Sequence, residues 1–267
     1  MSAIKPDNNN FTLSCKGGFF MNMKKNDKKF LEKVRFKVAK AIEDYQLIEE
    51  GDRILVAVSG GKDSMVLLDA LNNRKKYFDF SFDLVAVNIE LTDVGYRIEK
   101  EKIEKFCLER RIPFIYIKND IKIVNHRKHP CFYCAWNRRK LIFEYAVSRG
   151  FNKVAFGHNR DDVVETLLMN MIYHAETSAF PVKLKMFENK LEIIRPFIYV
   201  SNAEAVRYTE LIGYEPVAYN CPYAAGNDRE KFRKLIKDLH EINPHAVKNI
   251  FTAIHHIKKE YLPSYPD

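Results

Sequence analysis

The first group of residues suited to chemistry forms a glycine turn, Ser59-Gly60-Gly61-Lys62-Asp63-Ser64. The turn stands between a short apolar run at 53–58 and a helical pattern that continues to Leu71. Two glycines let the backbone approach a ligand closely, and the first turn of a helix directs N–H groups toward an anion. Hydroxyl and ammonium groups add donors, so the segment predicts a phosphate-binding loop. It is not a Walker A loop, because Asp63 replaces the Ser or Thr that follows the lysine there.

A second polar segment, Gly157-His158-Asn159-Arg160-Asp161-Asp162, follows another short apolar run at 153–156. Ligands bind at the carboxyl ends of strands in an open parallel sheet, so we expect this segment to lie at the ligand-binding edge with the glycine turn. Carboxylates suit Mg²⁺, and Asp161 shares a helix face with Glu165. Aspartate also favours the first turn of a helix, so a capping role is compatible with the same residues.

Cysteines form a third group of candidates. Cys131 and Cys134 are three residues apart before a helical run, and Cys221 lies far along the chain. Three interpretations compete: a redox-active dithiol, a zinc site completed by His126 and His129, and an iron–sulfur cluster held by the three cysteines. Three thiolates on a [4Fe–4S] cluster leave one iron open for chemistry.

The elements that position these groups follow from the apolar pattern. Strands are expected at 53–58, 84–89, 114–117 and 153–156. Helices are expected at 30–45, 65–71, 99–110, 140–149, 162–173, 202–212, 228–240 and 244–258. Because strands and helices alternate, we predict an α/β fold with a doubly wound, Rossmann-like parallel sheet and a C-terminal helical segment. The expected division is a flexible tail at 1–28, a nucleotide-binding domain at 29–200 and the helical segment at 201–267.

Composition narrows the class of protein. The 267 residues carry a net charge of +9, which favours a polyanionic partner such as nucleic acid. No apolar run reaches the roughly 18 residues of a membrane helix, and the polar start lacks the core of a signal peptide. Five cysteines in a chain of this length do not suggest a secreted disulfide framework. We therefore expect a cytoplasmic protein that does not enter the membrane.

In their order along the chain, these motifs resemble a known family. The glycine turn is similar to the pyrophosphate loop of the N-type ATP pyrophosphatases, or PP-loop superfamily, whose members release AMP and pyrophosphate. The Cys-x-x-Cys pair, Arg138-Arg139, Gly-His-x-x-Asp-Asp, Arg195-Pro196 and the lone Cys221 resemble the motif order of the tRNA 2-thiocytidine synthetase family. The resemblance spans about Phe30 to Ala253. One departure is Ala224, where many family members carry a further cysteine.

The resemblance implies which residues bind the cofactors. ATP would place its pyrophosphate in the glycine turn, against Ser59, Gly60, Gly61 and Ser64, with Lys62 and Asp63 taking part in catalysis. Asp63, together with Asp161 or Asp162, would hold Mg²⁺. Ala57, Gly157 and Ile89 are expected around the rest of the nucleotide, with the adenine beside 87–89. The resemblance also favours the [4Fe–4S] cluster, with Cys131, Cys134 and Cys221 as its ligands, so the C-terminal segment would contribute one cluster cysteine.

The implied activity is ATP-dependent thiolation of tRNA. The enzyme would adenylate C2 of a cytidine, at position 32 of the anticodon loop, and replace the oxygen with sulfur to give 2-thiocytidine. The resemblance implies a cysteine desulfurase as the sulfur source and a homodimer as the assembly. Three alternatives stay open: a tRNA 2-thiouridine synthetase, a zinc-bearing PP-loop ligase that adenylates its substrate to form an amide, and a nucleotide-binding regulatory module without turnover.

Basic and aromatic residues are candidates for RNA contacts. The basic candidates are Arg138, Arg139, Lys183, Lys185, Lys231, Arg233, Lys234 and Lys237, each of which is as readily explained by a solvated helix face. The aromatic candidates for stacking on a base are Phe132, Tyr133 and Trp136, which would otherwise pack in the core.

Overall fold

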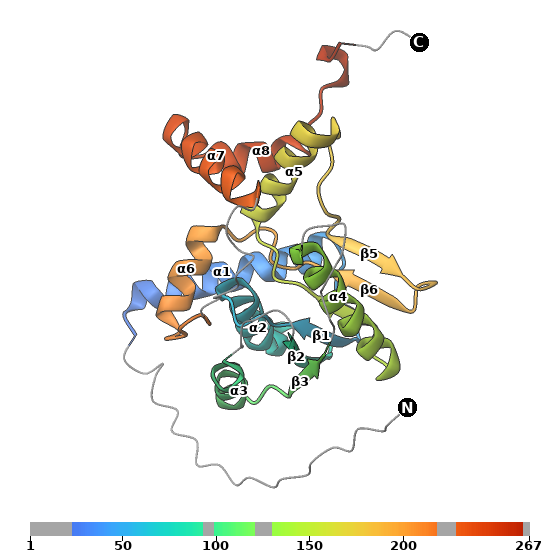
Figure 1. The fold of residues 1–267 in the computed structure, drawn as a ribbon. Coiled ribbons are helices and arrows are strands. Elements are labelled where there is room, and N and C mark those ends of the chain that lie inside the picture. The colour runs from blue at the N-terminus through green and yellow to red at the C-terminus, as the bar shows by residue number, and fades with distance from the viewer. Residues whose placement is uncertain (1–22, 93–98, 121–129, 218–227, 264–267) are drawn as a thin grey trace, which may run out of the picture.

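In the part of the chain that the structure describes, six strands form one sheet in the order β3-β2-β1-β4-β6-β5 (Figure 1). The computed structural model describes residues 23–92, 99–120, 130–217 and 228–263. Five strands run parallel to one another: β1 (Arg53–Ala57), β2 (Asp83–Leu91), β3 (Phe114–Asn119), β4 (Lys153–Ala155) and β6 (Leu191–Ile194). The edge strand β5 (Lys183–Met186) pairs antiparallel with β6. The strand order reverses between β1 and β4, which is where open α/β sheets form a crevice for ligands.

Helices cover both faces of the sheet. One face carries α1 (Lys25–Asp44), α2 (Lys62–Arg74), α3 (Lys100–Glu109) and α6 (Asn202–Leu211), which share one apolar core with the sheet. The other face carries α4 (Pro130–Ser148), which forms a second core. Within β1, Leu55 belongs to the second core and Val56 to the first. The strand is therefore buried on both faces, as its apolar run predicts.

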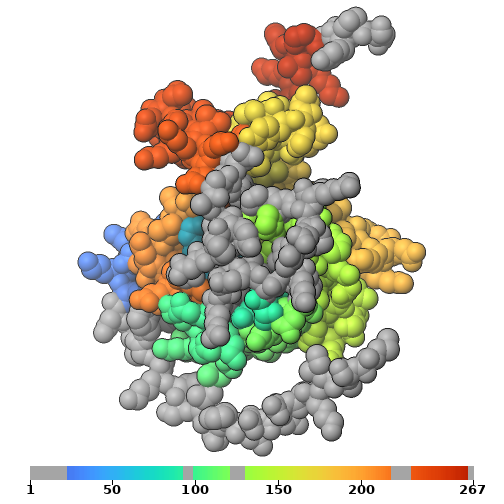
Figure 2. All heavy atoms as spheres, in the orientation of Figure 1, coloured from blue at the N-terminus to red at the C-terminus, as the bar shows by residue number. Residues whose placement is uncertain are grey.

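Three further helices lie beyond the sheet and form a third apolar core: α5 (Arg160–His174), α7 (Asp228–Ile242) and α8 (Ala246–Ala253). They project from the body of the molecule (Figure 2). Two short 3₁₀ turns, Lys75–Tyr77 and Lys259–Tyr261, follow α2 and α8. Within the described ranges, no helix combines the length and the apolar character needed to cross a membrane.

The predicted α/β class, with a mostly parallel sheet covered on both faces, is confirmed. Three predicted boundaries differ from the structure by four residues or more. The tail was expected to reach residue 28, but α1 begins at Lys25, because Asp27 suits the positive first turn of a helix even where no apolar period marks it. The fourth helix begins at Pro130 rather than at residue 140, with proline in the first turn where its missing N–H costs nothing. The last helix ends at Ala253 rather than at 258.

The β5–β6 hairpin was not predicted. Its turn contains three consecutive residues with positive φ, Phe187 (51°), Glu188 (56°) and Asn189 (67°). Glycine in the sequence usually indicates a hairpin turn with positive φ, and this turn contains no glycine. The four-residue strands also fall short of the runs that a periodic pattern reveals.

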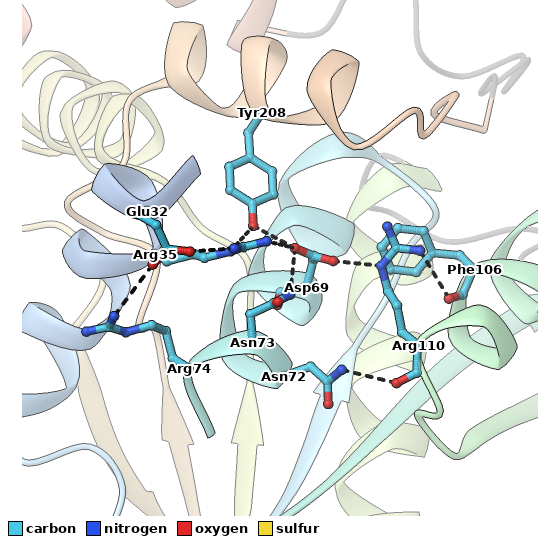
Figure 3. Close-up of polar contacts among 9 residues, drawn as sticks. All are labelled: Glu32, Arg35, Asp69, Asn72, Asn73, Arg74, Phe106, Arg110 and Tyr208. Carbon is cyan, nitrogen blue, oxygen red and sulfur yellow. Dashed lines mark hydrogen bonds and ion pairs between the residues drawn. The ribbon is translucent and has the colours of Figure 1, made fainter. Parts of the chain in front are cut away.

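A buried carboxylate holds together the helices that support the glycine turn (Figure 3). Asp69 of α2 is 1% exposed and accepts hydrogen bonds from Tyr208 of α6 (2.6 Å) and from Arg110, just after α3 (2.6 Å). Arg35 of α1 donates to both Asp69 (3.3 Å) and Tyr208 (2.8 Å). The network joins four helices at one carboxylate. Since α2 begins within the glycine turn, its position depends on this network.

We expect Asp69→Ala to destabilise the protein by about 3–5 kcal/mol, because it removes the buried carboxylate that Arg35, Arg110 and Tyr208 share, although Arg35 keeps its ion pair with Glu32. Urea unfolding followed by circular dichroism measures the change. Asp83→Ala is the matched control, since the Asp83 side chain is 70% exposed and such positions change stability by about 0.5 kcal/mol or less. A loss below about 1 kcal/mol for Asp69→Ala would show that the network contributes little.

Candidate functional site

Three loops meet at the carboxyl edge of the sheet. The glycine turn follows β1, Gly157-His158 comes shortly after β4, and Arg195 directly follows β6. Because these strands are neighbours, their loops border one cavity of 1580 Å³, together with the start of α4 and part of β2. The predicted site residues that line it are Ala57, Ser59, Gly61, Asp63, Ser64, Ile89, Cys131 and Gly157. The sheet thus brings together residues that span 101 positions of sequence, from Ala57 to Gly157 with both ends counted.

The glycine turn is organised by its own hydroxyls. Ser64 Oγ accepts from the Ser59 backbone N–H (3.1 Å) and donates to the Gly61 carbonyl (3.1 Å). Ser59 Oγ accepts from the Gly61 N–H (3.2 Å). Within the described residues, no side chain caps the first turn of α2. That turn therefore presents N–H groups and the positive end of the helix dipole to a ligand, as an anion site requires.

Gly60 makes the bend of the turn. Its φ of +82° lies in the left-handed region, which favours glycine. Its carbonyl accepts hydrogen bonds from the Val217 N–H (3.0 Å) and the Tyr214 hydroxyl (2.9 Å). Gly60 is thus an outer support of the turn rather than part of the cavity lining, and the segment after α6 holds it in place.

Gly157 lies against the backbone of the glycine turn. A Cβ added at Gly157 would come within 2.9 Å of Ser64 Cα and N. Nearby, Asn159 Nδ2 donates to Asp63 Oδ1 (3.0 Å), while Lys62 Nζ pairs with Asp63 Oδ2 (2.7 Å). The second polar segment therefore supports the first: it sets the position of Ser64 and orients the Asp63 carboxylate.

Asp161 and Asp162 cap helices. Asp162 accepts from the Asn159 N–H (2.9 Å), and Asn159 accepts from the Asp162 N–H (3.0 Å), which completes a capping box on α5. Asp161 accepts from the Asn202 N–H at the start of α6 (2.9 Å). Glu165, predicted to share the face of Asp161, is buried, and an ion pair (3.6 Å) joins it to Arg233 of α7. The capping role is observed, and the magnesium role of these two aspartates stays a prediction.

Two of the predicted cluster cysteines lie in the first turn and a half of α4. Cys131 lines the cavity, and Cys134 packs against the second core, both half-buried. Cys221, His126 and His129 lie outside the described residues, within which no group of three or more His, Cys, Asp or Glu side chains forms a metal site. Cys107 is fully buried in the first core, and burial raises the pKa of its thiol to about 12. Two thiols about one helical turn apart, with Cys131 at the cavity wall, are the donor type that an iron–sulfur cluster requires.

Three arginines line the same cavity as the glycine turn. Arg138 and Arg139 of α4 and Arg195 after β6 all line it. Arg195 is the most buried of the three, and its pKa is lowered to about 10, first by burial and then by the charge of Arg139. Phe132 and Trp136, 45% and 48% exposed, also border the cavity. Their exposure leaves the predicted stacking role available to both.

The comparisons with known proteins agree with this geometry. A family model described as a PP-loop domain matches residues 30–219. The tRNA-cytidine(32) 2-sulfurtransferase of Methylococcus capsulatus is 32% identical over 240 residues, which cover 88% of this chain and 82% of the relative. The chain belongs to the tRNA-cytidine(32) 2-sulfurtransferase family of PP-loop proteins. The enzyme of that name from Aliivibrio fischeri is 32% identical over 248 residues, covering 90% of this chain and 80% of its own.

Among solved structures, the U34-tRNA thiolase NcsA from Methanococcus maripaludis with its [4Fe-4S] cluster shares the fold. The TM-score is 0.73 at 23% identity, covering 88% of this chain and 82% of that one. Membership of the 2-sulfurtransferase family confirms the resemblance that the order of motifs predicts.

Sequence reasoning did not assign roles to Asn159, Tyr214 or Arg195. Of these, only Arg195 belongs to a position that the sequence analysis used as a motif, Arg195-Pro196, and no function was assigned to it there.

We expect Gly157→Ala to weaken ATP binding by about tenfold in this 2-sulfurtransferase family member, since the new methyl group would push the Ser64 backbone out of place. Isothermal titration calorimetry with Mg·ATP measures the affinity. Gly51→Ala is a suitable control: its positive φ (80°) strains an alanine, but nothing lies within 4 Å of the added Cβ. That variant should lose stability and keep the affinity for ATP. Unchanged ATP affinity in Gly157→Ala would contradict the supporting role of Gly157.

Proposed function

We propose that this protein is an ATP-dependent tRNA sulfurtransferase that converts cytidine 32 of its substrate tRNA to 2-thiocytidine. The observation that carries the proposal is one cavity that is bordered both by the anion-binding start of α2 and by Cys131 of α4. A site that activates a nucleobase with ATP and then delivers sulfur to it needs both groups within reach of one carbon atom. The names of the relatives supply the substrate, a tRNA cytidine at position 32.

The glycine turn provides the groups that bind ATP. The N–H groups of the first turn of α2 bind the pyrophosphate portion, and Lys62 adds a positive charge as pyrophosphate departs. Asp63 supplies a carboxylate for Mg²⁺, oriented by Asn159. The nucleoside then extends toward β2, where Ile89 lines the cavity.

The chemistry takes place at C2 of the cytosine ring. The C2 oxygen attacks the α-phosphorus of ATP, and the bond to the β-phosphate oxygen breaks, releasing pyrophosphate. A sulfur nucleophile at the oxidation level of sulfide adds to C2, after which the C2–O bond breaks and AMP leaves with that oxygen. The net exchange of oxygen for sulfur needs no oxidant or reductant. Adenylation is required because the original oxygen is otherwise a poor leaving group.

Cys131, Cys134 and Cys221 are the residues that would hold a [4Fe–4S] cluster. When bound by three thiolates, such a cluster offers one iron without a protein ligand, where sulfur can bind. The position of Cys131 in the cavity wall, facing the space that the glycine turn also borders, supports this assignment. A cysteine desulfurase is the proposed upstream source of sulfur.

Product analysis tests the function. Anaerobically purified and reconstituted protein is incubated with Mg·ATP, sulfide and a tRNA that carries cytidine at position 32, and the digested nucleosides are identified by mass spectrometry. We expect 2-thiocytidine, with one AMP and one pyrophosphate released per modified base. Formation of ADP and orthophosphate would refute the adenylation step. Formation of 2-thiouridine with no 2-thiocytidine would refute the assignment of the base.

Asp63→Asn should reduce the rate of thiolation by about 10²-fold or more, because a neutral amide cannot replace the carboxylate at the magnesium ion. Asp83→Asn, an exposed aspartate outside the cavity, is the matched control and should keep the wild-type rate. Single-turnover assays compare the two variants. Wild-type activity in Asp63→Asn would remove Asp63 from the mechanism.

Alanine at Cys131, Cys134 or Cys221 should each lower bound iron and sulfide and reduce the visible absorbance of the reconstituted protein by more than about half, since each removes one of three thiolate ligands. Cys107→Ala is the control, because its buried thiol lies in the first core, away from the cavity lining. Iron and sulfide analysis with an absorption spectrum measures the outcome. A colourless wild-type protein with one bound zinc would favour the zinc-bearing ligase instead.

A further inference from the structure

Arg195 is a buried cation on the cavity wall. It directly follows β6, is 9% exposed and lines the cavity. Its Nε donates to His158 Nδ1 (3.3 Å), and its Nη1 donates to the Pro181 carbonyl. The guanidinium carbon lies 5.0 Å from the centroid of the Phe180 ring. None of these three contacts is with a carboxylate: they are with an imidazole nitrogen, a backbone carbonyl and an aromatic ring.

The described residues supply no counter-ion to Arg195. No ion pair joins it to a carboxylate there, and the charge that acts on it most strongly is that of Arg139, another cation. Burying an ion costs several kcal/mol unless an opposite charge offsets that cost. An anion that binds between the guanidinium groups of Arg195 and Arg139 therefore stabilises the buried charge of Arg195. Arg139 is exposed and reaches the same cavity from α4, so an anion arriving from solvent has access to both.

The strand order separates Arg195 from the site of the ATP phosphates. The glycine turn follows β1, and the predicted adenine position lies on β2, on the side of β1 that faces away from β4 and β6. Arg195 follows β6, which is two strands from β1 in the other direction. Two strand spacings amount to roughly 9–10 Å. The phosphates of ATP already have their own donors in the glycine turn, so the anion at Arg195 belongs to the second substrate.

The size of the cavity agrees with two occupants. Its volume of 1580 Å³ exceeds the roughly 300–1,000 Å³ of sites that hold one small ligand. Aromatic side chains stand on the same side as Arg195: the His158 and Phe180 ring centroids are 4.8 Å apart, and both residues line the cavity. Single-stranded RNA loops are recognised by such combinations of stacked rings and arginine.

We propose that Arg195 and Arg139 bind a backbone phosphate of the tRNA substrate next to the nucleotide that enters the cavity. The inference deepens the proposed function, on which it rests for the identity of the RNA. Arginine suits this role because its planar fork of N–H groups binds two oxygens of one phosphate at once. The contact fixes the register of the RNA, so that one base, and not its neighbour, lies between the glycine turn and Cys131.

Separate binding measurements for the two substrates test the proposal. The full-length protein and its variants Arg195→Gln, Arg195→Lys and Arg139→Gln are titrated with tRNA by fluorescence anisotropy at several KCl concentrations. Binding of Mg·ATP alone is measured by calorimetry. Arg149→Gln is the matched control, since Arg149 is exposed at the far end of α4, where its carbonyl accepts from Arg53 at the start of β1. A thermal melt of each variant monitors folding.

We expect Arg195→Gln to weaken tRNA binding by about tenfold or more, as for the loss of a hydrogen bond to a charged group. The slope of log Kd against log salt should fall by about 0.7, the value for one phosphate contact of a single strand. ATP affinity should stay within about twofold of wild type. Arg139→Gln should change tRNA binding in the same direction, and Arg195→Lys should lie between glutamine and wild type because it keeps the charge and loses the fork.

Several results would overturn the proposal. One is wild-type tRNA affinity and salt slope in Arg195→Gln. Another is weaker ATP binding with unchanged tRNA binding, which would assign the arginine to ATP. An equal loss in Arg149→Gln would show a general effect of charge. If Arg195→Gln does not fold, the exposed Arg139→Gln decides by the same criteria. The assay needs no turnover, so a protein that binds tRNA through Arg195 and forms no 2-thiocytidine would refute the proposed function alone.

Discussion

The contact between the backbones of Gly157 and Ser64 sets the geometry of the site. Here the loop after β4 touches the loop after β1 with no side chain between them, and an added Cβ would come within 2.9 Å of Ser64. Because β1 and β4 are hydrogen-bonded neighbours, their loops leave the sheet side by side, and glycine lets them stay in contact beyond its edge. Asn159 then reaches Asp63, so one contact positions both the anion-binding turn and its carboxylate.

Other parts of the chain hold the same turn from outside. The Asp69 network joins α1, α2, α3 and α6. The glycine turn leads directly into α2, which begins at Lys62. The segment after α6 donates two hydrogen bonds to the Gly60 carbonyl. Val217 ends this described stretch four residues before Cys221 in the sequence, so the part of the chain that leads to the third cysteine is also the part that holds the turn.

Local patterns were sufficient to predict the parts of this protein whose structure is set by neighbouring residues. The apolar run of β1 signals burial on both faces, and the glycine turn signals an anion site. Features that depend on distant residues were missed. Nothing near Asn159 in the sequence indicates its hydrogen bond to Asp63. Nothing near Glu165 indicates its ion pair with Arg233. The β5–β6 hairpin was missed because a turn with three left-handed non-glycine residues has no local signature.

The strand order gives each half of the carboxyl edge a separate task. On the β1–β2 side, the edge offers N–H donors and apolar lining, which suit a nucleotide. On the β4–β6 side, the edge offers Arg195 with aromatic rings, which suit a stretch of RNA. Both substrates must present their reacting atoms over the boundary between β1 and β4, and Cys131 of α4 borders the same space. Activation and sulfur delivery act on one carbon atom in succession, so a base that enters from the β6 side meets ATP and sulfur without having to move between sites.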